Sequence, residues 1–142
     1  MADEWVLDAS VAVKCFITEP ESEAARALAG SGARLIAPEF IFAELASVAV
    51  KRTRRGDIDR AFADDMTASA PDLFDETFPT GPLTPRAQEI AFEHGTSVYD
   101  ALYLALAEER GAVMATADEK LVARLRGSSL EDWIQVLARR DS

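Results

Sequence analysis

The sequence predicts an α/β domain with a central parallel β-sheet of about four or five strands and helices on both faces. Short apolar runs rich in β-forming residues alternate with longer segments of helical periodicity, a pattern typical of parallel sheets with crossover helices. The chain has 142 residues, of which 49% are hydrophobic and 28% charged, the size and balance of one globular domain. We therefore expect residues 1–142 to form one domain.

The predicted strands are short apolar runs bounded by polar or turn residues. They cover 4–8, 33–36, 73–78, 112–116 and 132–137. The run 73–78 lies in a segment with three prolines and a glycine, so it is expected mainly as a loop that holds a short strand. Because the carboxyl ends of parallel strands meet at one edge, any site is expected at that edge.

The predicted helices are bounded by capping residues, prolines and glycines. They cover 9–16, 20–29, 38–55, 58–69, 85–94, 98–110 and 119–126. Pro38 is expected as the first residue of its helix and Gly56 as its end, with Asp57 capping the next helix. Ser97 is expected to open the helix 98–110, which is apolar on most sides and so is predicted to be a central buried helix, and Gly111 to close it.

Composition excludes several classes of site and location. A single cysteine and a single histidine rule out a disulfide framework within the chain and zinc sites built on several such ligands. No apolar run reaches the length of a transmembrane helix, and the acidic start at residues 1–4 is unlike a secretory signal, so we expect a cytoplasmic protein with no membrane contact. The formal net charge of −10 would repel nucleic acid unless metal ions or a local basic patch offset it.

Four acidic residues stand where a purely structural role does not fully explain them. Asp8 ends the first strand, Glu44 lies on an apolar helical face with no cation at helical spacing, Asp100 lies early in the apolar helix 98–110, and Asp118 follows the strand 112–116. Each also has a structural interpretation. Asp8 and Asp118 can cap helices, Asp100 fits a capping box with Ser97, and Glu44 can be partly exposed.

Taken together, the four acids predict a cation site. Strand ends and helix starts would bring these carboxylates to one sheet edge, where they would repel one another unless cations neutralise them. With no histidine or cysteine nearby the ligands would all be oxygen, which favours Mg²⁺ or Mn²⁺. The hydroxyls of Ser10 and Thr116 could add ligands or orient the carboxylates.

The motifs that contain these acids resemble the PIN-domain ribonucleases, and within them the VapC-type toxins of toxin–antitoxin pairs. They are VLDAS (6–10) with Lys14 following, APEFIFAELASV (37–48), SVYDALYLALA (97–107) and TADEKL (116–121). They occur in the family's order over nearly the whole chain. One departure is Ser47, where many relatives have asparagine, so the role of that position is left open.

The resemblance implies a metal-dependent endoribonuclease that hydrolyses RNA phosphodiester bonds and acts as a toxin. Its metal-binding and catalytic acids match Asp8, Glu44, Asp100 and Asp118, with Asp8 and Asp100 expected as the primary ligands of Mg²⁺ or Mn²⁺. Glu44 and Asp118 would bind a second ion or position the attacking water. The resemblance also implies a cognate antitoxin as a partner and a homodimer.

The basic run 51–55 is a candidate contact for the RNA backbone. We expect Lys51 and Arg52 in this run, together with Lys14 near Asp8, to bind substrate. The competing interpretation is that cations at the end of a helix merely complement its dipole.

Three other functions compete with the nuclease. An adhesion-type metal module would need serine where Ala12 stands, and an aspartyl phosphatase would need aspartate at Ser10. An inactive or non-toxin PIN fold that acts through metal or protein binding is the main alternative. The presence of all four acids argues against it.

Overall fold

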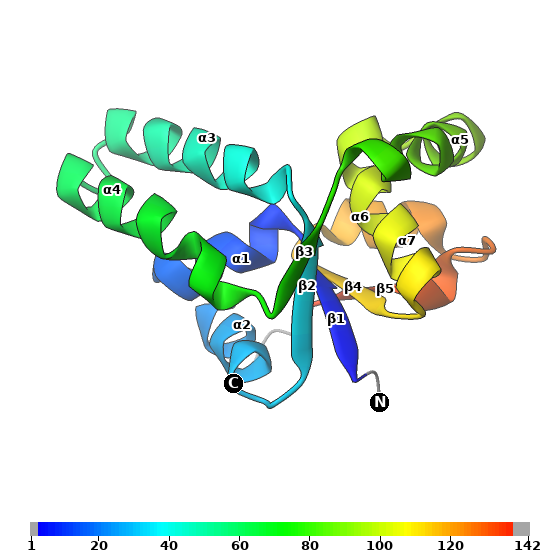
Figure 1. Ribbon diagram of the computed structural model, residues 1–142, viewed down its shortest axis with the longest axis horizontal. Helices are drawn as coiled ribbons and strands as arrows, with labels where there is room; N and C mark the ends of the chain where they lie inside the picture. The colour runs from blue at the N-terminus through cyan, green and yellow to red at the C-terminus, as the bar shows by residue number, and fades with distance from the viewer. Residues whose placement is uncertain (1–2, 138–142) are drawn as a thin grey trace.

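A computed structural model describes residues 3–137 and shows the predicted α/β architecture (Figure 1). Residues 1 and 2, which begin the acidic N-terminal segment, lie outside the described part. Five parallel strands form one sheet in the order β3-β2-β1-β4-β5. The strands are β1 (Glu4–Leu7), β2 (Arg34–Pro38), β3 (Glu76–Phe78), β4 (Val113–Thr116) and β5 (Ile134–Val136).

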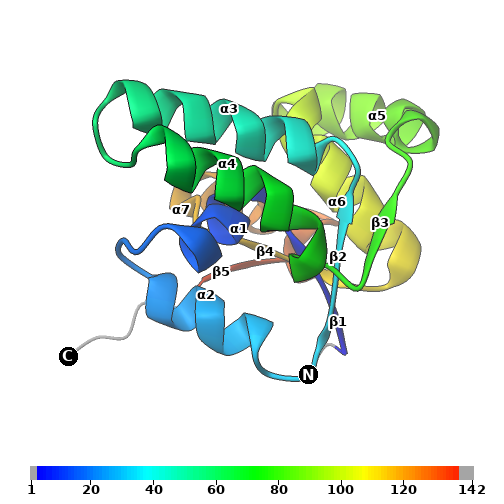
Figure 2. The same ribbon diagram turned by 60° about the vertical axis from the view of Figure 1, so that its left-hand side comes forward.

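Helices cover both faces of this sheet, as the alternation of elements predicts. One side carries α1 (Ala9–Phe16), α2 (Ser22–Ala29), α3 (Ile41–Arg54) and α4 (Arg60–Ser69). The other side carries α5 (Thr84–His94), α6 (Val98–Arg110) and α7 (Glu119–Leu125). Short 3-10 turns occupy Ala70–Leu73, Gly81–Leu83 and Glu131–Trp133. Figure 2 shows α3 and α4 side by side as an antiparallel hairpin.

The strand order places a topological switch point between β1 and β4. The chain winds outward from β1 through β2 to β3 and then crosses back to β4 on the other side of β1. Leu7 pairs with Ala115 in register, and the amide of Asp8 donates to the carbonyl oxygen of Ala115 at 3.3 Å. Loops that leave such a point in opposite directions form a crevice at the carboxyl ends of the strands. Asp8 follows the last residue of β1 and Thr116 is the last residue of β4, so both lie at the switch point.

The helix α6 is the central helix of the core, as predicted. Seven consecutive residues, Ala101 to Ala107, are buried, and the helix packs against β1, β2 and β4. The side chain of Ser97 caps it by accepting a hydrogen bond from the Asp100 amide at 3.0 Å, and Gly111 ends it with φ +65°, a left-handed conformation that favours glycine.

Two predicted helix starts are wrong. Pro38 does not open α3 but is the last residue of β2, paired in register with Phe78, and α3 begins at Ile41. The apolar run before Pro38 pairs on both edges, and these pairings outweigh the local preference of proline for a helix start. Asp57 does not cap α4. The cap is Asp59, which accepts a hydrogen bond from the Phe62 amide at 2.8 Å.

Several predicted elements are shorter than expected. The strand predicted at 73–78 is reduced to three residues, β3, and the strand predicted at 132–137 to β5. One 3-10 turn ends at Leu73, shortly before β3 begins at Glu76. Another ends at Trp133, directly before β5. Within residues 3–137, no helix is long and apolar enough to cross a membrane.

Candidate active site

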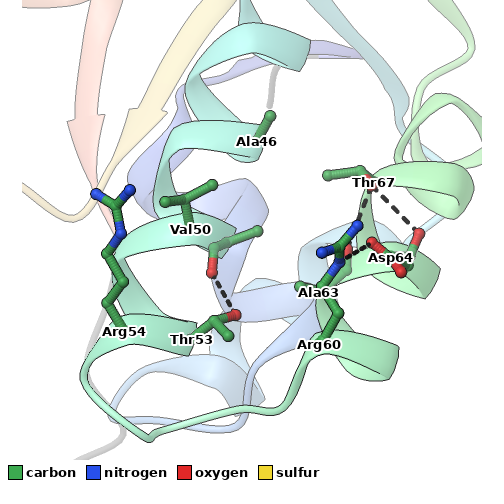
Figure 3. Close-up of a pocket in the computed structure, with 9 residues that line it drawn as sticks. Ala46, Val50, Thr53, Arg54, Arg60, Ala63, Asp64 and Thr67 are labelled. Atoms are coloured by element: carbon green, nitrogen blue, oxygen red, sulfur yellow. Dashed lines mark hydrogen bonds and ion pairs between the residues drawn. The ribbon is translucent and has the colours of Figure 1, made fainter.

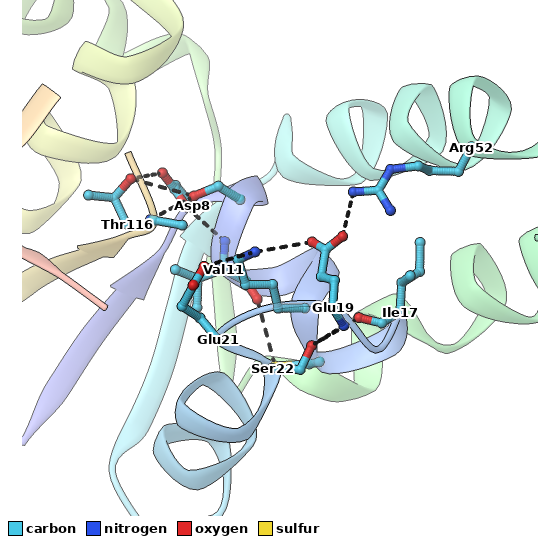
Figure 4. Close-up of polar contacts among 12 residues, drawn as sticks. Asp8, Val11, Ile17, Glu19, Glu21, Ser22, Arg52 and Thr116 are labelled. Atoms are coloured by element: carbon cyan, nitrogen blue, oxygen red, sulfur yellow. Dashed lines mark hydrogen bonds and ion pairs between the residues drawn. The ribbon is translucent and has the colours of Figure 1, made fainter. Parts of the chain in front are cut away.

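Asp8 is a buried carboxylate at the end of β1. Its side chain is 5% exposed and caps α1 by accepting a hydrogen bond from the Val11 amide at 3.0 Å. Two hydroxyls also donate to it: Ser10 Oγ to Oδ1 at 2.5 Å and Thr116 Oγ1 to Oδ2 at 2.5 Å (Figure 4). The structure therefore confirms the capping role of Asp8, and this role is compatible with the predicted site role.

Burial raises the pKa of Asp8 from 3.8 to about 6. Loss of hydration disfavours the charged carboxylate, and the negative charge of Asp100 adds to this. The hydrogen bonds from Ser10, Thr116 and Val11 act in the opposite direction and do not cancel the effect of burial. The site thus contains a carboxylate whose negative charge lacks compensation from the protein.

The two hydroxyls join the ends of β1 and β4. Besides binding Asp8, Ser10 Oγ accepts from the Ala117 amide at 2.9 Å, and Thr116 Oγ1 accepts from the Asp118 amide at 3.1 Å. Each hydroxyl therefore has both a donor and an acceptor role, which fixes its orientation. This arrangement orients the Asp8 carboxylate, the role that the sequence predicted for Ser10 and Thr116.

Asp100 interacts through charge with Asp8 on one side and with Asp118 on the other. Burial raises the pKa of Asp100, and the charge of Asp118 raises it further, while Ser97 opposes the shift. Asp118 caps α7 by accepting from the Leu121 amide at 3.1 Å and is otherwise exposed. The structure therefore links Asp8 to Asp100 and Asp100 to Asp118.

Glu44 enters the site from α3 and has a partner on α6. The hydroxyl of Tyr103 donates to Glu44 Oε1 at 2.6 Å. Glu44 is half-buried, whereas Tyr103 is 2% exposed. Burial raises the pKa of Tyr103, and the charges of Glu44 and Asp8 raise it further.

The donor chemistry of this site fits a divalent cation that prefers oxygen ligands. Within residues 3–137, none of the four acids forms an ion pair with a lysine, arginine or histidine, so their charges are left for another cation to balance. The four side chains are more widely spaced than the sequence argument expected, since no group of three or more potential ligands in the described chain lies close enough to hold a metal ion. The acids interact through charge in pairs, Asp8 with Asp100 and Asp100 with Asp118.

The family model for the PIN domain matches residues 5–127. The chain belongs to the PIN-domain family. The match contains β2, β3, β4, all of β1 except Glu4, and all four acids, and it confirms the resemblance that the motifs predicted.

Individual relatives of this PIN domain point to the VapC type. The chain is 29% identical to Ribonuclease VapC3 of Pyrobaculum aerophilum over 121 residues, which are 84% of this chain and 92% of that protein. The crystal structure of PAE2754 from the same organism superposes with a TM-score of 0.67 at 27% identity, covering 88% of this chain and 81% of that one.

Two more distant structures share the fold of this PIN domain. A toxin–antitoxin complex from Klebsiella pneumoniae matches with a TM-score of 0.65 at 14% identity, covering 94% of this chain and 98% of that one. VapBC-5, a member of the VapBC family of toxin–antitoxin systems from Mycobacterium tuberculosis, matches with a TM-score of 0.56 at 19% identity, covering 95% and 98%.

Two of the three cations predicted to bind substrate have partners inside the PIN domain. Lys14 is buried and pairs with Glu19 at 3.2 Å and with Glu21 at 3.5 Å. Arg52 pairs with the other oxygen of Glu19 at 2.7 Å (Figure 4). Glu19 therefore links α1 to α3. Lys51 is exposed and forms no ion pair with any residue in 3–137.

We expect Glu19→Gln to destabilise the PIN domain. The substitution removes the negative charge shared by two cations, one of them buried, and a hydrogen bond to a charged group contributes about 1–3 kcal/mol. Urea unfolding followed by circular dichroism measures the change. Asp72→Asn, at an exposed carboxylate, is the control and should change little. Equal stability of the two variants would contradict a structural role for the link.

A cavity of about 470 Å³ lies between α3 and α4 (Figure 3). Small residues line much of it, and its charged groups at α4 are already paired, Arg60 with Asp64 at 2.9 Å. It contains none of the predicted catalytic side chains. The carboxylates, and not this cavity, are therefore the candidate active site.

Sequence reasoning missed two residues of this region. The sequence pattern favours a core role for Tyr103 and indicates no role for Glu19. The signal for Tyr103 was present, because a tyrosine in an otherwise apolar buried helix needs a partner for its hydroxyl, and it lies three residues after Asp100. For Glu19 no local signal exists, since its partners are set by the packing of α1 on α3.

Proposed function

We propose that this PIN domain is an endoribonuclease that requires Mg²⁺ or Mn²⁺ and acts as the toxin of a toxin–antitoxin pair. The observation that carries the proposal is Asp8, a buried carboxylate at the switch point of the sheet, oriented by two hydroxyls and without a cation partner among residues 3–137. The names of the relatives support the same activity.

The four acids and two hydroxyls would have different tasks. Asp8 and Asp100 would hold the metal ion, while Glu44 and Asp118 would bind a second ion or orient the attacking water. When bound, such an ion activates water and stabilises negative charge on the phosphate and the leaving oxygen. Ser10 and Thr116 keep the Asp8 carboxylate in one orientation, since each donates to a different oxygen of it.

Metal removal tests this function directly. Purified protein is incubated with total RNA and either Mg²⁺ or Mn²⁺, then with excess EDTA, beside a double variant, Asp8→Asn with Asp100→Asn. We expect discrete RNA fragments that require the metal, disappear with EDTA and are absent with the double variant.

Two other outcomes of this experiment would not support a metal-dependent nuclease. Intact RNA with both metals and several RNA classes, from folded and partner-free protein, would contradict the nuclease. Cleavage that persists in EDTA or in the double variant would indicate a contaminating ribonuclease. Calorimetric titration with Mn²⁺ would then decide whether the carboxylates bind metal at all, as the metal-binding alternative requires.

We propose that the exposed Lys51 contacts the RNA backbone. Lys14 and Arg52 would take part only if Glu19 releases them. For Lys51→Ala we expect weaker RNA binding at low salt and a salt-dependence slope smaller by about one ion, as for loss of one phosphate contact. Filter binding to catalytically inactive protein over a salt series measures both. An unchanged slope would contradict the contact.

We further propose that the entire chain, 1–142, works as one domain in the cytoplasm, as a homodimer, and is inhibited by a cognate antitoxin. Support for the antitoxin comes from the toxin–antitoxin titles of the structural neighbours, which describe those proteins.

Expression of this chain alone should arrest growth of its host, and co-expression of a neighbouring antitoxin gene should restore growth.

A further inference from the structure

The hydroxyl of Tyr103 contacts the candidate site at Glu44. It donates to Glu44 Oε1 at 2.6 Å, across 59 positions of sequence, and so joins α6 to α3. Tyr103 thus connects Glu44 on α3 to the core helix α6, which packs against β1.

The ring that carries this hydroxyl is held in place by packing. Tyr103 is 2% exposed, and its ring lies 4.9 Å from that of Phe40, which directly precedes α3. A buried side chain in contact with a neighbouring ring has little freedom to choose another rotamer. The position of the hydroxyl is therefore set by the core and not by Glu44.

Glu44, in contrast, has freedom that only this hydrogen bond restricts. Its side chain is half-buried, and within residues 3–137 Tyr103 is the one hydrogen-bond partner of that side chain. The bond engages Oε1 and leaves Oε2 without a protein partner in the described part of the chain. A phenol keeps its proton at neutral pH, so the Tyr103 hydroxyl is the donor of this bond and the carboxylate is the acceptor.

We propose that Tyr103 is a positioning residue that holds the Glu44 carboxylate toward the metal site, with one oxygen anchored and the other presented. This proposal rests on the proposed nuclease function. A plain core tyrosine would need an acceptor for its hydroxyl but would have no effect on catalysis beyond its effect on folding, so the two roles differ in measurable ways.

Tyr103→Phe is the central variant, because it removes the hydroxyl and keeps the ring. Loss of a partner that orients a metal ligand lowers metal affinity or activity by roughly 10- to 100-fold. We expect a fall of this size in kcat, or an equal rise in the Mn²⁺ concentration for half-maximal rate, with little change in KM for RNA.

The control is Tyr99, which lies on the same helix as Tyr103, and the coupling test uses Glu44 on α3. Tyr99→Phe removes an exposed hydroxyl for which residues 3–137 provide no hydrogen-bond partner, and it should cleave RNA like the wild type. Adding Tyr103→Phe to Glu44→Gln should cause no further loss, since the hydroxyl acts through Glu44. A folded Tyr103→Phe variant with wild-type kcat and metal dependence, or losses that multiply in the double variant, would overturn the proposal.

A spectroscopic readout covers the case in which Tyr103→Phe does not fold. The chain has two tyrosines, so fluorotyrosine labelling gives two fluorine NMR lines, assigned by Tyr99→Phe. We expect Glu44→Gln in metal-free protein, and Mg²⁺ in the wild type, to move the Tyr103 line and leave the Tyr99 line in place. A Tyr103 line that responds to neither would overturn the proposal.

These measurements separate the two hypotheses. If the wild type cleaves RNA and Tyr103→Phe cleaves equally well, the positioning role is wrong and the nuclease stands. If the wild type cleaves no RNA but Mg²⁺ moves the Tyr103 line only when Glu44 is present, the nuclease is wrong and the link between Tyr103 and the metal site stands.

Discussion

Asp8→Asn should lower the rate of RNA cleavage by about 10³-fold, the scale on which loss of one charged group that stabilises a transition state is measured. The substitution keeps the size of the side chain but removes the charge that would bind the cation. The three groups that donate to Asp8, on Ser10, Val11 and Thr116, lose one acceptor oxygen among them. Single-turnover cleavage of labelled RNA at saturating Mn²⁺ measures the rate.

The matched control is Asp72→Asn. It makes the same chemical change at an exposed aspartate with no hydrogen bond or ion pair to any residue in 3–137, so its rate should equal that of the wild type. Circular dichroism is used to check that both variants are folded. If folded Asp8→Asn retains a tenth or more of the activity, as a rough threshold, Asp8 is not a primary metal ligand.

The same variant should be more stable than the wild type near neutral pH when no metal is present. In the folded protein the pKa of Asp8 is raised from 3.8 to about 6, so the folded state binds this proton more tightly than the unfolded state. The contribution of Asp8 to stability is therefore full below the unfolded pKa and is lost as the pH rises to about 6. The asparagine side chain of the variant does not titrate, so its contribution does not change over this range.

The expected size follows from the shift. A change from 3.8 to about 6 corresponds to about 3 kcal/mol of unfolding free energy. We expect the stability of Asp8→Asn minus that of the wild type to increase by this amount between about pH 4 and pH 7. Carboxylates such as Glu4 and Glu108, whose pKa values are lowered by hydrogen bonds from arginines, affect both proteins equally and cancel in the difference.

Urea unfolding in EDTA at a series of pH values tests this expectation. A difference that stays constant with pH, or decreases as the pH rises, would contradict the raised pKa. Adding Mn²⁺ at neutral pH should reverse the order, because a cation that binds Asp8 stabilises the wild type and not the variant. A buried carboxylate that lowers the stability of the metal-free protein is typical of a functional site.

Much of the fold was predictable because its signals are local. The helix 98–110 is bounded by Ser97 and Gly111, and the structure confirms both ends. Where the prediction was wrong, longer-range pairing decided the outcome. Pro38 has a local preference for a helix start, but β2 lies between two partner strands and extends to include it.

The sequence indicates which residues are candidates for the site, but it does not indicate their contacts. Asp8 and Thr116 follow from the rule that parallel strands end at one edge, and they hydrogen-bond across 108 positions of sequence. The expectation of one tight cluster did not hold within residues 3–137, because Asp100 and Asp118 start helices whose directions the strand order alone does not specify.

The sequence by itself determined the order and type of the elements, the PIN-domain motifs and the identity of the four acids. Only the tertiary structure decided which partner each charged or polar group received: Tyr103 for Glu44, and Glu19 for Lys14 and Arg52. The physical reason is the separation in sequence between the residues that interact. Propensity, capping and hydrophobic periodicity act between neighbours in the chain, whereas a hydrogen bond or ion pair between helices depends on how those helices pack in three dimensions.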